Sequence, residues 1–173
     1  KVRGLAQVEV DFTADYIDYM AEWARRIEGE VLTSDRPNET MLLLRKPLGV
    51  VAGVLPWNFP FFLIARKLAP ALVTGNTIVI KPAELTPFTA LAIAEKCAQA
   101  GIPAGVVNVL TGKGAQVGQA LVEHPQVDKI AFTGSSAVGL HIQQSCPQVK
   151  RMSLELGGNC PMIVTASADL AAA

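Results

Sequence analysis

The stretch that decides the fold is residues 48–80, which read LGVVAGVLPWNFPFFLIARKLAPALVTGNTIVI. Residues 48–55 are an apolar run of strand length, whereas the apolar segment 59–73 has the length of a helix. Gly75 and Asn76 are typical of a helix end, and residues 77–80 make a second short run rich in β-branched side chains. A strand, a helix and another strand in this order predict a βαβ unit whose two strands run parallel.

The alternation continues towards the end of the chain. We expect helices at 86–100, 115–123 and 135–145, the first of them capped by Thr86 with Pro87 as its first helical residue. Strands are expected at 106–110, 129–132, 151–155 and 161–165, and a further helix from 167 onwards. The pattern predicts an α/β fold, a Rossmann-like parallel sheet with helices on both faces.

The residues before position 48 follow a different pattern. Residues 5–27 carry apolar side chains at helical spacing, and Gly29 is suited to ending that helix. Residues 33–40 have the composition of a turn, and 41–44 are a short apolar run typical of a strand. We therefore divide the chain into residues 1–47, a helix and short strands that belong to a larger domain, and residues 48–173, an incomplete ligand-binding domain.

Composition narrows the function classes. The 173 residues carry no net charge, which gives no reason to expect a nucleic-acid partner, and no apolar stretch is long enough to cross a membrane. Three widely spaced cysteines do not suggest a disulfide framework. There is no CxxC pair, and His124 and His141 stand apart, so no metal site is expected. These features predict a reduced, cytoplasmic protein.

Polar residues follow the predicted strands, at the sheet edge where open α/β proteins bind ligands. Asn58 lies between two prolines that stiffen its backbone, so its amide suits donation to a developing oxyanion; capping of the next helix is the alternative. Lys81 and Glu84 are spaced to hold the hydroxyls of a ribose, where a carboxylate would repel a 2′-phosphate. A surface ion pair between these two residues is the alternative.

Three further strand ends carry similar signals. Gly112, Gly114 and Gly118 are spaced one residue wider than the usual dinucleotide fingerprint, so that signal is weak. Ser135 opens a helix after a glycine, which suits either an anion site or a simple cap. Glu155 stands between two leucines, an apolar setting that predicts a raised pKa and a general base; an exposed strand-end carboxylate is the alternative.

Five segments together resemble the NAD(P)-dependent aldehyde dehydrogenases in order and spacing: PWNFP at 56–60, TGNT at 74–77, KPAE at 81–84, FTGS at 132–135 and LELGG at 154–158. Residues 12–30 and 59–72 are most similar to lactaldehyde and glycolaldehyde dehydrogenases. The resemblance implies NAD-dependent oxidation of a small hydroxyaldehyde to the acid, through a cysteine thiohemiacetal and a thioester. Residues 48–173 would be the NAD-binding domain, and the whole enzyme a homo-oligomer, a dimer or tetramer, with 41–44 in a subunit contact.

The resemblance also implies roles for single residues. Asn58 would donate to the oxyanion, Glu155 would activate the hydrolytic water, and Lys67 would support the asparagine. Lys81 and Glu84 would hold the adenosine ribose of NAD, in preference to NADP. The remaining cofactor contacts would be Leu55, Pro56, Trp57, Gly114, Phe132, Thr133, Gly134, Ser135, Val138, Leu156 and Gly157, together with Asn58 and Glu155.

The chain departs from the family in one respect. The nucleophilic cysteine belongs to a segment that follows Ala173 in the family pattern, so we expect an excerpt that does not oxidise aldehydes by itself. Cys160 is expected to be a buried strand residue rather than a substitute nucleophile. A stand-alone, non-catalytic nucleotide-binding module is the alternative. A further alternative is a different Rossmann-type dehydrogenase. Such an enzyme would need a GxGxxG motif after the first strand, and residues 55–60 contain no such motif.

Overall fold

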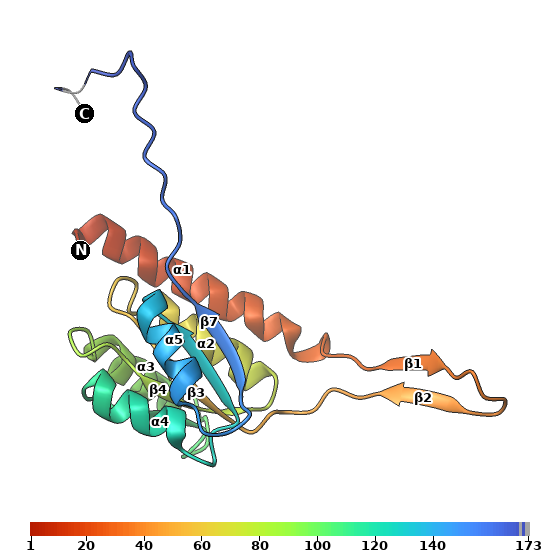
Figure 1. The fold of residues 1–173 in the computed structure, drawn as a ribbon. Helices are drawn as coiled ribbons and strands as arrows, with labels where there is room; N and C mark the ends of the chain where they lie inside the picture. The colour runs from red at the N-terminus through yellow and green to blue at the C-terminus, as the bar shows by residue number, and fades with distance from the viewer. Residues whose placement is uncertain (170, 172–173) are drawn as a thin grey trace.

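The centre of the molecule is a five-stranded parallel sheet with the strand order β5-β4-β3-β6-β7 (Figure 1). The computed structural model describes residues 1–169 and 171. The strands are β3 (Val50–Val54), β4 (Thr77–Lys81), β5 (Val107–Val109), β6 (Lys129–Thr133) and β7 (Arg151–Glu155). All four neighbouring pairs are parallel, which confirms the predicted Rossmann-like α/β fold.

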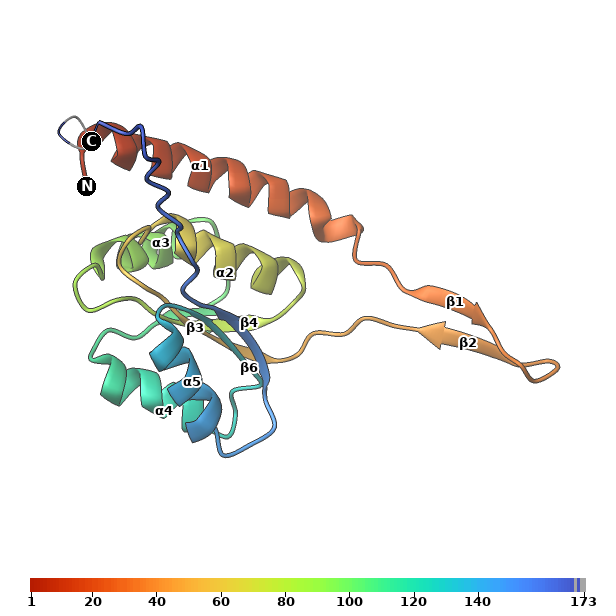
Figure 2. The same ribbon diagram turned by 45° about the horizontal axis from the view of Figure 1, so that its top comes forward.

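Helices cover both faces of this sheet (Figure 2). One face packs against α2 (Phe62–Val73) and α3 (Phe88–Gln99). The other packs against α4 (Gln119–Glu123), which follows a π-helical turn at Gly114–Gly118, and α5 (Ser136–Ser145). Both faces are therefore apolar, as the near-continuous hydrophobic runs of the strands require.

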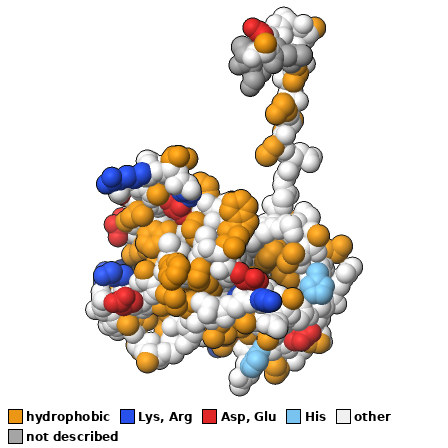
Figure 3. Space-filling model, turned by 90° about the vertical axis from the view of Figure 1, so that its left-hand side faces the viewer, with side chains coloured by type: hydrophobic (Ala, Val, Ile, Leu, Met, Phe, Trp, Pro, Cys, Tyr) orange, Lys and Arg blue, Asp and Glu red, His pale blue; other side chains and the backbone are white. Residues whose placement is uncertain are grey.

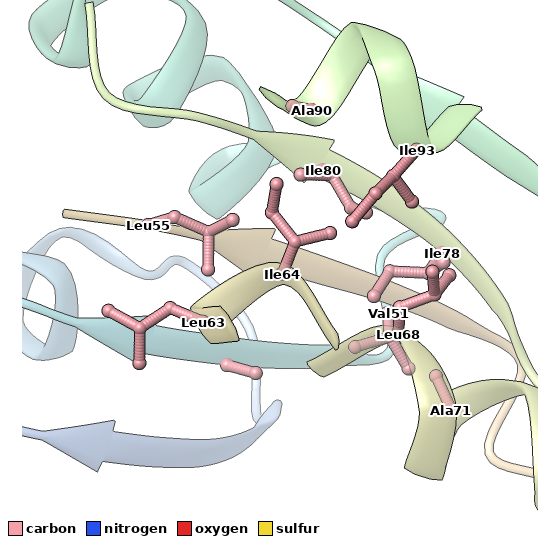
Figure 4. Packing of buried hydrophobic residues seen from close by; sticks show 11 residues of the cluster. Val51, Leu55, Leu63, Ile64, Leu68, Ala71, Ile78, Ile80, Ala90 and Ile93 are labelled. Atoms are coloured by element: carbon pink, nitrogen blue, oxygen red, sulfur yellow. The ribbon is translucent and has the colours of Figure 1, made fainter. Parts of the chain in front are cut away.

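Two hydrophobic clusters divide the side chains of the strands between the two helical layers. Val51, Ile78 and Ile80 point towards α2 and α3, whereas Ala52 and Ile130 point towards α4 and α5. Successive side chains of a strand alternate between faces, so one strand feeds both clusters. In the first cluster Ile64 of α2 reaches in between the strands and α3 (Figure 4).

The long helix α1 (Arg3–Ala21) lies across α2 in both ribbon views and continues as a 3-10 turn, η1 (Glu22–Arg25). Two of its aromatic rings contact the first turn of α2. Phe12 lies with its ring centroid 4.5 Å from that of Phe62, and Tyr16 meets the same ring edge-on at 5.5 Å. α1 therefore forms an outer layer over the sheet's α2 side.

An antiparallel hairpin stands out from the body as an arm (Figure 1). It consists of β1 (Glu30–Thr33) and β2 (Thr40–Leu43), and all eight residues are exposed. The strand expected at 41–44 is thus confirmed with its bounds shifted by one residue. Its partner, β1, has only Val31 and Leu32 as apolar residues, too short a run to predict a strand.

Several predicted element ends are wrong. α2 begins at Phe62 rather than 59, and α3 begins after Pro87, which occupies the N-cap position itself. The Thr86 hydroxyl caps nothing among the described residues. The helix expected at 5–27 is α-helical only to Ala21. Helix ends depend on which backbone groups find partners, and sequence patterns locate them only to within a few residues.

The segment after β7 also differs from the prediction. Residues 161–165 form no strand, the described residues from 167 onwards form no helix, and Cys160 is exposed rather than buried. An apolar run becomes a strand only beside a partner that accepts its hydrogen bonds, and no described strand lies along this segment. In the described part of the chain, no helix is both long and apolar enough to cross a membrane.

Candidate active site and cofactor site

The carboxyl ends of the strands meet at one edge of the sheet because the strands are parallel. The register places Val54 beside both Lys81 and Phe132, and Thr133 beside Glu155. This edge lies opposite the β1–β2 arm, on the side that Figure 3 faces. Figure 3 shows hydrophobic side chains over much of this side, with charged groups scattered among them. The predicted gathering of Lys81 and Glu155 at one edge is therefore observed.

Glu84 lies against the glycine-containing loop that follows β5. Its Oε1 accepts a hydrogen bond from the backbone N–H of Gly114 at 2.7 Å. Lys81 is buried, and this burial lowers the pKa of its ammonium, while the nearby carboxylate of Glu84 opposes that shift. Lys81 and Glu84 form no ion pair, so the structure does not support the surface-pair alternative.

A pocket of about 250 Å³ opens between the π-helical turn and α5. Gly114 and Val138, two of the cofactor contacts that the resemblance implied, both line it. A Cβ on Gly114 would meet no atom within 4 Å, so this backbone faces open space. The wall is mainly apolar, with Gln119 and His141 as a hydrogen-bonded pair at 2.9 Å. The size and apolar lining suit a flat heterocyclic base.

The turn after β6 is shaped by Gly134 and Ser135. A side chain on Gly134 would collide with the buried ring of Phe132, so this position requires glycine. Ser135 is the N-cap of α5, and its hydroxyl accepts the N–H of Val138 at 3.3 Å, which confirms the capping alternative. The side chain of Phe132 is buried in the α4–α5 cluster, so only its backbone is open to a ligand.

Glu155 is held by three donors. Its Oε2 lies 3.5 Å from Lys67 Nζ and accepts the Thr133 hydroxyl at 3.0 Å. Its Oε1 lies 3.4 Å from a guanidinium nitrogen of Arg66. Burial is the largest single influence and acts to raise the pKa of Glu155, but Lys67, Thr133 and Arg66 together lower it below the ordinary value. The predicted raised pKa is therefore wrong, because α2 brings two cations that the flanking leucines do not reveal.

Lys67 is a buried cation on the inner face of α2. Its side chain is 5% exposed, and this burial lowers the pKa of the ammonium, while Glu155 acts to raise it. The contact that the structure shows for Lys67 is thus with the carboxylate rather than with Asn58. Arg66 carried no predicted role, although two adjacent cations in an apolar helix are a signal that could have been used.

Asn58 is placed differently from the other predicted residues. It is exposed and lines a groove beside α1 with Trp57 and Phe61. Glu155 lines a separate hollow under α2. The described residues therefore do not bring Asn58 and Glu155 into one pocket. Within residues 1–169 and 171, no group of three or more His, Cys, Asp or Glu side chains could hold a metal ion.

A protein-family sequence model described as "Aldehyde dehydrogenase family" matches residues 1–173. The chain belongs to the aldehyde dehydrogenase family. It is 56% identical over 171 residues to lactaldehyde dehydrogenase of Escherichia coli strain K12, covering 98% of this chain and 36% of that protein. It is 45% identical to an NADP(+) succinate-semialdehyde dehydrogenase of the same strain, covering 95% of this chain and 34% of the relative.

A solved structure supports the same assignment. The crystal structure of lactaldehyde dehydrogenase from Escherichia coli superposes with a TM-score of 0.89 at 57% identity, covering 91% of this chain and 33% of that one. This aldehyde dehydrogenase chain thus spans about a third of the length of the relatives it matches.

Proposed function

We propose that this chain is the cofactor-binding part of a longer NAD-dependent aldehyde dehydrogenase that oxidises a small hydroxyaldehyde, such as lactaldehyde or glycolaldehyde, to its carboxylic acid. The observation that carries the proposal is Glu155, an anchored carboxylate at the same sheet edge as an apolar pocket for a base. Similarity to lactaldehyde dehydrogenase supports the choice of substrate class.

The chemistry we propose is covalent. A cysteine thiolate from outside this chain attacks the aldehyde carbon, and the Asn58 amide donates to the resulting oxyanion. Bound NAD supplies the acceptor for the hydride that leaves this carbon. Glu155 then takes a proton from the water that hydrolyses the thioester. None of the three cysteines of this chain lines the hollow of Glu155 or the groove of Asn58, so the chain alone should not turn over aldehyde.

Glu155 is in the form that a general base requires. Its carboxylate is ionised at neutral pH and can accept a proton, but the lowered pKa makes it a weaker base than a carboxylate whose pKa lies near the operating pH. Its side chain is 37% exposed, so a proton that it accepts can pass on to solvent. Lys67 and Thr133 would hold the same oxygen in place between turnovers.

The preference for NAD rests on Glu84. Its carboxylate is exposed and oriented by the Gly114 N–H, next to the pocket that we assign to the adenine. A 2′-phosphate on the adjoining ribose would face this negative charge, which favours NAD over NADP. The family contains a relative named for NADP(+), so the preference must come from individual residues such as this one.

We further propose that the whole enzyme is a homo-oligomer, a dimer or tetramer, in which the β1–β2 arm contacts another subunit. The arm projects from the body, and Val31, Met41 and Leu42 are exposed apolar side chains on it. A hairpin whose outer edges are unpaired offers backbone donors and acceptors to another strand.

The base assignment is tested in the full-length enzyme with Glu155→Gln. We expect thioester hydrolysis to slow by about 100-fold or more, because a general base contributes on this scale. The initial burst of NADH should remain, because hydride transfer precedes hydrolysis. Glu95→Gln, an exposed carboxyl variant on α3, is the matched control and should leave both steps unchanged. Loss of the burst in Glu155→Gln would contradict the assignment.

A further inference from the structure

We infer that Glu9 of α1 is a positioning residue for Asn58, holding the start of α2 and with it the turn that presents the Asn58 amide. The inference rests on the proposed function, since it takes Asn58 as the oxyanion donor. Glu9 belongs to a different element and lies far from Asn58 in the sequence.

Glu9 caps a helix that has no cap of its own. Its side chain is only 5% exposed, and its Oε1 accepts the backbone N–H groups of Phe61 at 2.8 Å and Phe62 at 3.1 Å. The first N–H groups of a helix have no partner within it. Phe61, the N-cap residue of α2, provides no capping side chain, so the carboxylate from α1 takes that place.

The same carboxylate connects to the residue that follows Asn58. Its other oxygen pairs with the Lys1 ammonium, and this ammonium lies 3.9 Å from the centroid of the Phe59 ring. Phe12 and Tyr16, which belong to α1 like Glu9, hold Phe62 in place through their aromatic contacts with its ring. Lys1 therefore holds the chain on the C-terminal side of Asn58 at Phe59, and α1 holds it at the first turn of α2.

The chain before the turn is anchored separately. The Leu55 N–H donates to the Lys81 carbonyl at 3.0 Å, which extends the β3–β4 ladder by one residue. Within the turn from Leu55 to Phe61, the Pro60 carbonyl accepts a hydrogen bond of 3.3 Å from the Thr89 hydroxyl. Asn58 itself is exposed, so its amide position depends on these flanking anchors.

Positioning matters here because an oxyanion donor acts only over a short range. A displacement of about 1 Å can cost about 100-fold in rate, even when the altered residue is remote from the chemistry. Burial acts to raise the pKa of Glu9, but the Lys1 ammonium and the two N–H groups together lower it, so the acceptor is an ionised carboxylate. A charged acceptor makes the stronger hydrogen bonds to backbone N–H groups.

The test uses pre-steady-state kinetics of the full-length enzyme. Glu9→Leu removes the acceptor, and we expect the NADH burst rate to fall by about 10- to 100-fold, with the Kd for NAD changed less than about 2-fold. Glu9→Gln keeps an oxygen facing both N–H groups and should recover most of the burst. Asp11→Asn is the control, a variant of an exposed carboxylate on α1 that accepts a hydrogen bond from Gln7 of the same helix.

A double variant separates positioning from general stability. If Glu9 acts through Asn58, the loss caused by Glu9→Leu should disappear in an Asn58→Ala background, because residues that act as one unit are not additive. Glu9→Asp, which retracts the carboxylate by one methylene, repeats the comparison with a milder change should Glu9→Leu not fold. A normal burst in folded Glu9→Leu or Glu9→Asp, or losses that add to that of Asn58→Ala, would overturn the inference.

The failure of the proposed function looks different. In that case the unaltered enzyme would show no aldehyde-dependent NADH burst, or Asn58→Ala would leave the burst unchanged. If Asn58→Ala slows the NADH burst and Glu9→Leu does not, the inference about Glu9 is rejected and the proposed function stands.

Discussion

From the ion pair between Lys67 and Glu155 we predict how the rate of thioester hydrolysis depends on pH when Lys67 is replaced. Replacing Lys67 with Met removes the buried cation but fills a similar volume, so the packing of α2 should be retained. The carboxylate then loses a favourable charge and keeps the burial that disfavours its ionised form. The pKa of Glu155 should therefore rise in Lys67→Met, and the acid limb of thioester hydrolysis should move to higher pH.

The size of the shift follows from the separation of the charges. At 3.5 Å between Lys67 Nζ and Glu155 Oε2, Coulomb's law gives about 1 kcal/mol at the dielectric constant of water and about 5 kcal/mol at an effective value of 20. The side chain of Glu155 is 37% exposed, so solvent screening places the interaction towards the lower value. About 1.4 kcal/mol corresponds to one pH unit, so we expect a shift of about one unit.

The lowered pKa of Glu155 also affects how the stability of the fold depends on pH. A carboxylate whose folded-state pKa is lowered stabilises the fold above its unfolded pKa, and this contribution disappears as pH falls through the folded pKa. Lys67→Met narrows the gap between the two pKa values. Just below pH 4.5, the ordinary pKa of a glutamate, the thermal midpoint of Lys67→Met should therefore depend less on pH than that of the unaltered enzyme.

The assay is single-turnover hydrolysis of the preformed thioester, followed from about pH 3 to about pH 7, a range that extends below the ordinary carboxyl pKa. Lys96→Met is the matched control, because Lys96 is an exposed residue of α3 whose ammonium donates a hydrogen bond to Gln99 of the same helix. An acid limb that stays in place in Lys67→Met would show that Glu155 is not the titrating base. A shift to lower pH would show that Lys67 does not stabilise its carboxylate.

Two other predictions concern the cofactor and the arm. Glu84→Gln should reduce the preference for NAD over NADP, measured as the ratio of kcat/KM values, by about 10-fold, because it removes one negative charge beside the 2′-phosphate; unchanged selectivity would mean that Glu84 does not face the ribose. Leu42→Asp places a charge on the exposed arm and should weaken subunit association in light scattering; an unchanged molecular mass would exclude the arm from the subunit contact.

Local patterns account for the parts of the fold that sequence reasoning predicted. The alternation of apolar runs and turn residues in 48–80 identified β3, α2 and β4, and Gly75 ends α2 with a positive φ of 77° as expected of a helix-terminating glycine. The parallel arrangement followed, because a helical crossover between strands leads back to a parallel neighbour. The edge that collects Lys81, Thr133 and Glu155 was predictable for the same reason.

Sequence patterns did not predict the contacts between segments that lie far apart in the sequence. The neighbours of Glu155 in the sequence are leucines, and these predicted a raised pKa, whereas α2 supplies Arg66 and Lys67 and lowers it. Glu9 shows no motif, yet it caps α2 across the α1–α2 contact.

The sequence by itself determined the order of strands and helices, the aldehyde dehydrogenase motifs and the edge at which their residues gather, because periodicity and turn chemistry act over a few neighbouring residues. Only the tertiary structure decided the charge environment of Glu155 and the support behind Asn58. Electrostatic and hydrogen-bonding forces depend on distance in space, and the folded backbone sets those distances.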